Sequence, residues 1–160
     1  MGKNDKKTTA KSSTAKSSKA APVTAAGILA PTELWRQTPA EHDYPAAANY
    51  LGLIADDHVV KSIVDALRKA PVIHYRANDL LRAARLDLLP LDDEHVKIDL
   101  AKVITGEALS PVLIVRGDVL HDYPLTVADG YHRICASYHL SEATYIPCKI
   151  VDLPVPEKLA

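Results

Sequence analysis

The chain has 160 residues, which is enough for one domain of ordinary size and hardly enough for two. Hydrophobic residues make up 48% and charged residues 24%, as in globular proteins, and no apolar run approaches the ~20 residues of a membrane span. The N-terminus lacks the apolar core of a secretory signal, so we expect a cytoplasmic protein. In that compartment its two cysteines, Cys135 and Cys148, are expected to be reduced, and the alternative is a disulfide between them.

Residues 1–30 are a low-complexity mixture of Lys, Ser, Thr and Ala, which buries too little surface to offset the entropy of ordering. A disordered tail is therefore predicted. Residues 1–19 carry +5, from six lysines against Asp5, and because the whole chain carries −1, the rest carries −6. This pattern fits a nucleic-acid-binding arm, but it also fits a solubilising tail or an expression remnant. The tail lysines are Lys3, Lys6, Lys7, Lys11, Lys16 and Lys19.

Residues 31–71 are predicted to form a helical extension. The stretch PAAANYLGLI (45–54) starts with a proline, which suits a first helical position, and continues with good helix formers. The stretch HVVKSIVDALRKAP (58–71) places its apolar residues on one stripe, has acids before it and basic residues in its last turn, and stops at Pro71. This second stretch predicts an amphipathic helix that packs on the core.

The remaining elements predict a small α+β domain over residues 72–156. Residues 72–90 fit a strand followed by an irregular or short helical piece, and the sequence does not decide between the two. A helix is predicted from Asp92 and Asp93 to Gly106, which suits a helix C-terminus. A strand (110–118), a polar loop (119–124) and a second strand (125–128) form a predicted hairpin. A helix to about Leu140 and a strand over 146–153 complete the order.

The segment ADGYHRICAS (128–137) compresses several functional side chains into the point where a strand becomes a helix. Asp129 stands at the predicted N-cap, and Gly130 would let the backbone approach a ligand. The free N–H groups of a first helical turn bind phosphate or carboxylate, and His132 and Arg133 would add donors there. Because helix N-termini favour acids, Arg133 in the first turn suggests an anion. The alternative is a capped helix whose His132 and Arg133 face solvent or pair with Asp129.

Other chemistry at this segment is less well supported by the spacing. His132 and His139 are seven residues apart and no HxxxH or CxxC pattern occurs, so no metal site is predicted. Cys135 lies in an apolar run, where a thiol is expected to pack rather than to act as a nucleophile.

Three stretches together resemble the ParB/sulfiredoxin superfamily: LSPVLIVRGD, DYPLTVADGYHRICASYHL and IPCKIVDL. They are similar to the strand, the hairpin loop, the GGCHR-type turn and helix, and the closing IPAK-type strand of sulfiredoxins. The resemblance covers residues 82–153. It implies a ParB/sulfiredoxin-like fold in which the turn holds nucleotide phosphates.

The resemblance also implies roles for individual residues. Phosphate contact falls on Gly130, His132 and Arg133, with Tyr131 inside the same box. Arg85, seven residues before Asp92, corresponds to a second phosphate-side or substrate-side arginine, and His95 takes the place of a lysine that helps bind ATP. Tyr131 occupies the place of the catalytic cysteine, so sulfinic-acid reductase activity is not expected.

The other branches of the superfamily imply different activities. The GERR box of partition proteins is reduced to DGYHR, and with Ala160 as the last residue no complete partition clamp is expected. A kinase branch phosphorylates free serine with ATP or ADP and a carboxylate base. Asp129 is the obvious base, with Asp92, Asp93 and Glu94 as less well placed candidates. A nuclease would need clustered metal-binding carboxylates, which the sequence does not reveal.

The sequence thus predicts a nucleotide, ATP or CTP, or another phosphate-bearing ligand at residues 129–133, with Mg²⁺ if phosphate is transferred or hydrolysed. The competing hypothesis is a non-enzymatic, DNA-associated accessory protein that contacts nucleic acid through Lys3–Lys19.

Overall fold

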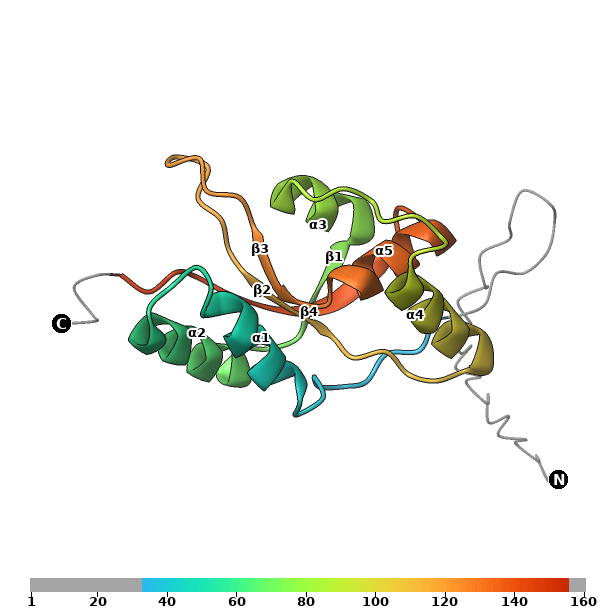
Figure 1. Ribbon diagram of the computed structural model, residues 1–160, viewed down its shortest axis with the longest axis horizontal. Helices are drawn as coiled ribbons and strands as arrows, with labels where there is room; N and C mark the ends of the chain where they lie inside the picture. The colour runs from blue at the N-terminus through green and yellow to red at the C-terminus, as the bar shows by residue number, and fades with distance from the viewer. Residues whose placement is uncertain (1–32, 156–160) are drawn as a thin grey trace, which may run out of the picture.

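A computed structural model describes residues 33–155, which form a mixed α+β domain with five helices and a four-stranded mixed sheet (Figure 1). The predicted disordered tail and its lysines lie outside the described residues. The helices are α1 (Asp43–Leu51), α2 (Asp57–Lys69), α3 (Ala77–Ala84), α4 (Glu94–Thr105) and α5 (Tyr131–Leu140). The strands are β1 (Ile73–Arg76), β2 (Val112–Val115), β3 (Thr126–Asp129) and β4 (Tyr145–Val151).

The sheet has the order β1-β4-β2-β3. Strands β2 and β3 form an antiparallel hairpin, β2 and β4 run parallel, and β4 and β1 run antiparallel. The hairpin, the strand β4 and the helices predicted over 58–71, 92–106 and 129–140 are thereby confirmed. The segment 72–90, which the sequence left open, resolves into the edge strand β1 followed directly by α3.

Helices cover both faces of the sheet (Figure 1). On one face, α3, α4 and α5 pack on Val112 and Ile114 of β2, and on the other face α1 and α2 pack on Leu113 and Val115. Successive residues of a strand point to opposite faces, so the unbroken apolar run VLIV is what a strand buried on both sides requires. The region predicted as a helical extension therefore supplies one layer of the core.

Two helix starts differ from the sequence prediction. Helix α1 begins at Asp43, two residues before Pro45, and ends at Leu51. Asp129 is not the N-cap of α5: it is the last residue of β3, and Gly130 is the N-cap. No helix among residues 33–155 combines the length and the apolar character that crossing a bilayer requires.

Candidate functional site

The turn between β3 and α5 depends on a glycine. Gly130 has φ 112°, a left-handed conformation that L side chains rarely adopt. A Cβ atom at this position would lie 2.8 and 2.9 Å from the two methyl groups of Val112. The chain reverses here against the buried start of β2, and a side chain would prevent that approach. Gly130 is thus explained by local geometry, and the geometry also leaves the helix without a capping side chain.

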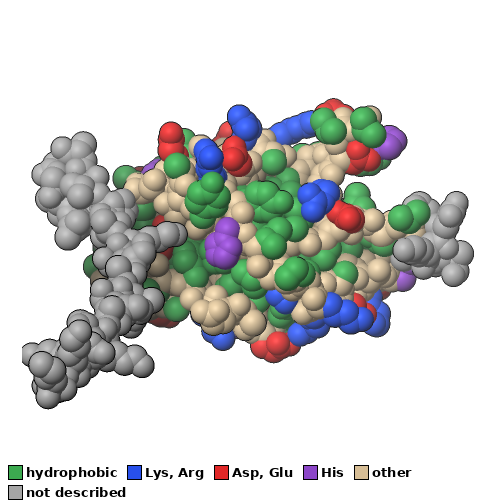
Figure 2. Space-filling model, turned by 180° about the vertical axis from the view of Figure 1, so that it is seen from behind, with side chains coloured by type: hydrophobic (Ala, Val, Ile, Leu, Met, Phe, Trp, Pro, Cys, Tyr) green, Lys and Arg blue, Asp and Glu red, His purple; other side chains and the backbone are tan. Residues whose placement is uncertain are grey.

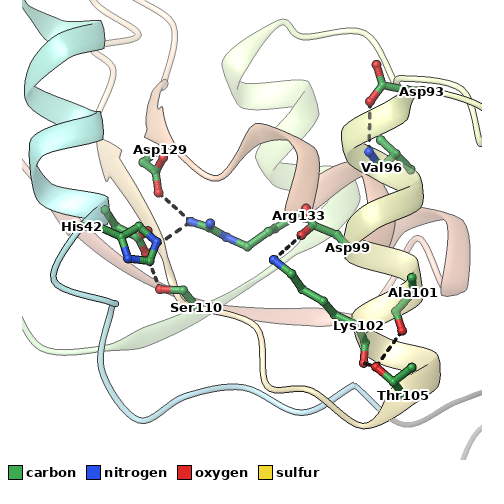
Figure 3. Close-up of polar contacts among 11 residues, drawn as sticks. His42, Asp93, Val96, Asp99, Ala101, Lys102, Thr105, Ser110, Asp129 and Arg133 are labelled. Carbon is green, nitrogen blue, oxygen red and sulfur yellow. Dashed lines mark hydrogen bonds and ion pairs between the residues drawn. The ribbon is translucent and has the colours of Figure 1, made fainter.

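The carboxylate of Asp129 accepts a hydrogen bond from Arg133 instead of capping the helix (Figure 3). The Nη2 atom of Arg133 lies 2.7 Å from Oδ2 of Asp129 and 3.7 Å from Oδ2 of Asp43, so the guanidinium joins β3, α5 and α1. The Arg133 side chain is 15% exposed and that of Asp43 is 3% exposed. This outcome matches the alternative in which Arg133 pairs with Asp129, and it removes Arg133 from the set of free cations.

Ser110, two residues before the start of β2, extends this polar network. Its hydroxyl donates to Asp43, and the backbone N–H of Ala40 donates to the Ser110 oxygen over 2.9 Å. Asp43 and Ser110 lie 67 positions apart in the chain, and neither stands in a pattern that the sequence singles out. The sequence offered a signal for the Arg133–Asp129 pair, whose spacing is i,i+4, but none for the tertiary partners.

A cavity of about 210 Å³ opens in front of this network, between α4 and α5. His95 from α4 and His132 from α5 face each other there, with ring centroids 4.6 Å apart. Lys102 lines the same cavity, with its Nζ atom 3.3 Å from the carboxylate of Asp99 (Figure 3). The structure thus brings together His95 and His132, which are far apart in the sequence, and adds Lys102, which the sequence analysis missed. The remaining residues lining the cavity are Ile98, Asp129, Gly130 and Arg133.

The first backbone N–H groups of α5 lie beside the cavity, and two of them belong to His132 and Arg133, which line it. Those of Tyr131, His132 and Arg133 precede the first helical hydrogen bond, in which the N–H of Ile134 donates to Gly130. No side chain among residues 33–155 caps this helix. The contrast with α4 is direct, because Oδ1 of Asp93 accepts from the N–H groups of both His95 and Val96 at 3.0 Å. The positive end of α5 is therefore available to an external anion.

The pKa values of Asp129 and Asp93 are shifted in opposite directions. Burial raises the pKa of Asp129, and the negative charge of Asp43 adds to that effect, while Arg133 opposes it. The hydrogen bond from the Val96 N–H is the main cause that lowers the pKa of Asp93, and the proximity of His132 contributes to the same direction. A carboxyl group with a raised pKa that lines a cavity is suited to accept and release a proton.

The other predicted site residues lie elsewhere. Arg85 caps the C-terminus of α3 in the left-handed conformation and pairs with Asp122 in the β2–β3 loop, away from the turn. The Tyr131 hydroxyl donates to the carbonyl of Asp87 over 2.5 Å, and Tyr131 does not line the cavity. Asp92 and Glu94 do not line it either.

Both cysteines are fully buried in the core, as the sequence suggested. Burial raises the pKa of the Cys135 thiol, and it raises the pKa of Cys148 to about 12. A thiol in this state stays protonated at neutral pH and is a poor nucleophile.

The residues present do not fit a resident metal ion. Within residues 33–155 no three His, Cys, Asp or Glu side chains are arranged so that they could hold a metal ion together. The two acids that line the cavity are each paired with a cation, Asp99 with Lys102 and Asp129 with Arg133.

No protein-family model, curated protein or solved structure matches this chain.

Proposed function

We propose that this chain is a ParB/sulfiredoxin-like domain that binds a phosphate-bearing ligand, a nucleotide such as ATP or CTP, in the cavity at the N-terminus of α5. The observation that carries the proposal is that the uncapped N-terminus of α5, with the N–H groups of His132 and Arg133, meets two histidines and Lys102 on one cavity. Helix N-termini and cationic side chains are the groups with which proteins bind phosphate.

The size of the cavity limits what it encloses. Pockets that hold a drug-sized ligand occupy about 300–1,000 Å³, whereas this one occupies about 210 Å³. A phosphate group fits such a volume, and the base and the ribose of a nucleotide would extend over the surface beside it. The proposal thus assigns phosphate contact to His95, His132, Lys102 and the α5 backbone. Arg133 takes a different role from that implied by the resemblance, because it holds the carboxylate of Asp129 at the cavity wall.

Phosphotransfer or nucleotide hydrolysis is the enzymatic form of the proposal. It assigns the proton acceptor to Asp129, whose carboxyl group lines the cavity and whose pKa is raised by burial. Turnover of ATP or CTP that disappears in Asp129→Asn, with ligand binding retained, would support this form. Binding without turnover in the wild type would restrict the domain to a binding role.

A thermal-shift panel tests the binding proposal. Phosphate, pyrophosphate, ATP and CTP, each with and without Mg²⁺, are added to the wild type, to His132→Ala and to His58→Ala. His58 lies on the exposed surface of α2 and serves as the matched control. A ligand that binds the folded state raises the melting temperature. Loss of one hydrogen bond to a charged group weakens binding roughly 10- to 100-fold, so we expect the shift to shrink in His132→Ala alone. If no ligand stabilises the wild type, or if His58→Ala behaves as His132→Ala does, the proposal fails.

The lysine-rich segment supports a second candidate function, DNA association through Lys3–Lys19. Six lysines against one aspartate would give a binding constant that falls steeply with salt. DNA binding that is lost on deletion of residues 1–30, while the nucleotide response stays intact, would show that the two activities are separate. Salt-insensitive binding, or binding that survives the deletion, would argue against this role for the tail.

A further inference from the structure

The tip of the β2–β3 hairpin has an unusual composition for an exposed turn. Turn tips are usually polar, yet Val119 and Leu120 are 94% and 87% exposed, the highest values among the large hydrophobic residues described. The tip projects from the body of the molecule in Figure 1, and in Figure 2, seen from behind, it forms the lobe at the upper right. Adjacent aliphatic side chains on a projecting loop are typical of an interaction site.

A large groove lies directly beside this tip, between α3 and the hairpin. Its volume is about 660 Å³, within the range of ligand and peptide pockets. Its apolar lining includes Leu80 and Ala83 of α3, Ile114 of β2, Leu125 and Ile150, and Val119 at the tip forms part of one wall. The same face of the molecule thus carries an apolar projection and an apolar depression.

The charges on the two features are complementary in part. The tip holds Asp118 and Asp122, and the groove is bordered by Arg82, Arg85 and Arg116, but also by Asp79 and by Asp118 itself. Arg82 is paired with Asp79 and Arg116 with Asp152, and one pair between tip and rim already forms within the chain, since Arg85 binds Asp122. Both members of the Arg85–Asp122 pair are more than half exposed, and an exposed ion pair contributes little free energy. Replacing it by an Arg85–Asp122 pair between two molecules would therefore cost little.

From this self-complementarity we propose that the hairpin tip of one molecule docks into the α3–hairpin groove of a second copy, and reciprocally, about a two-fold axis. In such an arrangement each Val119–Leu120 pair is buried against the partner's groove, and the acids of the tip meet the arginines of the rim. Because the two contacts in this arrangement are reciprocal about a two-fold axis, the assembly closes as a dimer. The acids at the tip also disfavour an anionic membrane as the occupant.

The hairpin is rigid enough to present its tip. A Cβ atom on Gly117 would lie 2.4 Å from the carbonyl oxygen of Tyr123, so the two arms touch at this point. Above it, Asp118 and Tyr123 exchange backbone hydrogen bonds of 2.9 Å in both directions. The N–H of Leu125 donates to the carbonyl of Ala83 over 3.0 Å, which fixes the hairpin to α3. The projection and the groove therefore keep a constant relative position.

Sedimentation velocity of the full chain at increasing concentration tests the proposal. We expect the wild type to shift from one chain towards two. The tip variant Val119→Ser/Leu120→Ser should bind itself at least tenfold more weakly, because each aliphatic side chain loses its burial. The control Leu53→Ser/Ile54→Ser removes a second exposed apolar pair, at the end of α1, and should leave association unchanged.

A groove variant distinguishes tip-to-groove contact from tip-to-tip contact. Ala83→Glu adds bulk and a negative charge to the groove from an exposed position on α3, and it should also prevent association. A mixture of the tip variant and the groove variant restores one of the two contacts, so mixed dimers should form where neither variant alone forms any. Melting curves equal to that of the wild type show that the variants are folded.

The proposal is overturned if the wild type stays monomeric at every concentration, or if Ala83→Glu associates as well as the wild type does. It is also overturned if the Leu53→Ser/Ile54→Ser control weakens association equally. Flotation with neutral phosphatidylcholine vesicles provides the competing outcome: vesicle binding that requires Val119 and Leu120, in a chain that does not self-associate, would assign the tip to a membrane.

Discussion

Helices α4 and α5 pack against each other, but their N-termini are built in opposite ways. Helix α4 starts at Asp93, whose carboxylate accepts two backbone hydrogen bonds and caps the helix. Helix α5 starts at Gly130, which has no side chain, and its first turn contains His132 and Arg133 with no acid. The first arrangement satisfies the helix within the protein. The second leaves backbone N–H groups and the imidazole of His132 beside a cavity, which is the arrangement on which the proposed phosphate site depends.

The two aspartates beside these helix starts differ in the same sense. Asp93 gains backbone donors, and its pKa is lowered. Asp129 precedes Gly130 at the end of β3, where burial raises its pKa despite the bond from Arg133. Proximity to a cation therefore does not by itself decide the state of a carboxyl group, because the loss of solvent around Asp129 outweighs it. Sequence alone showed two aspartates before two helices and could not distinguish their environments.

Among variants at the two helix starts, the largest loss of stability is expected from Arg133→Met. It leaves Asp43 and Asp129 buried without their shared cation, and breaking a buried ion pair from one side costs about 3–5 kcal/mol. We expect the free energy of unfolding, measured by urea titration, to fall by that amount. In the same background Asp129→Asn should recover part of the loss, because one uncompensated charge is removed.

The control for Arg133→Met is Arg116→Met. Arg116 pairs with Asp152 at a distance of 2.6 Å, which is shorter than the Arg133 contacts, but its side chain is 53% exposed. Exposed pairs contribute about 0–1 kcal/mol. Equal losses in the two variants would contradict the view that Arg133 fixes a buried network at the start of α5.

The next largest effect is expected from Gly130→Ala. The left-handed backbone costs an L residue about 1–2 kcal/mol, and the approach to Val112 adds at least ~1 kcal/mol of overpacking. Unfolding should therefore be easier by about 2–3 kcal/mol. Gly106→Ala separates the two causes, because Gly106 has φ 75° and no atom within 4 Å of its Cβ position. A larger loss at Gly106 than at Gly130 would refute the steric argument.

The elements with a local signal were predicted well. The stripe of α2, the Gly106 stop of α4 and the hairpin each arise from residues close together in the chain, and they appear as expected. The packing of α1 and α2 on one face of the sheet could not be predicted in this way. It depends on Leu113 and Val115 of β2, which are far from these helices in the sequence and pack against them in the fold. The N-cap at Asp129 was assigned by residue type, whereas the close packing of Gly130 on Val112 decided the turn.

The same division holds for the candidate site. His132 and the Arg133–Asp129 pair lie within one turn of helix, so their proximity could be read from spacing. Their partners Asp43, Ser110 and Lys102 reach the site through tertiary packing, for which a single sequence has no periodic signal. Arg85 shows the opposite case: the resemblance implied a role at the phosphate site, but in the structure this side chain borders the hairpin groove.

The smallest effect is expected from Asp93→Ala, which removes the cap of α4. The melting temperature should fall less than in either variant at α5, and Asp93→Asn should recover most of the loss because asparagine caps as well as aspartate does. Asp92→Ala is the neighbouring control, since Asp92 makes no such bond. A loss at Asp92 equal to that at Asp93 would exclude capping as the cause.

The pH dependence separates the two helix starts most cleanly. Because the folded pKa of Asp93 is lowered from 3.8, its contribution to stability is present above 3.8 and is lost as the pH falls through the folded value. The difference in melting temperature between wild type and Asp93→Ala should thus stay constant from about pH 7 to about pH 5 and shrink as the pH falls further. Gly130→Ala adds no ionisable group at α5, so its penalty should stay constant over the same range. A penalty at Asp93 that does not change with pH would mean that α4, like α5, begins without help from a charged cap.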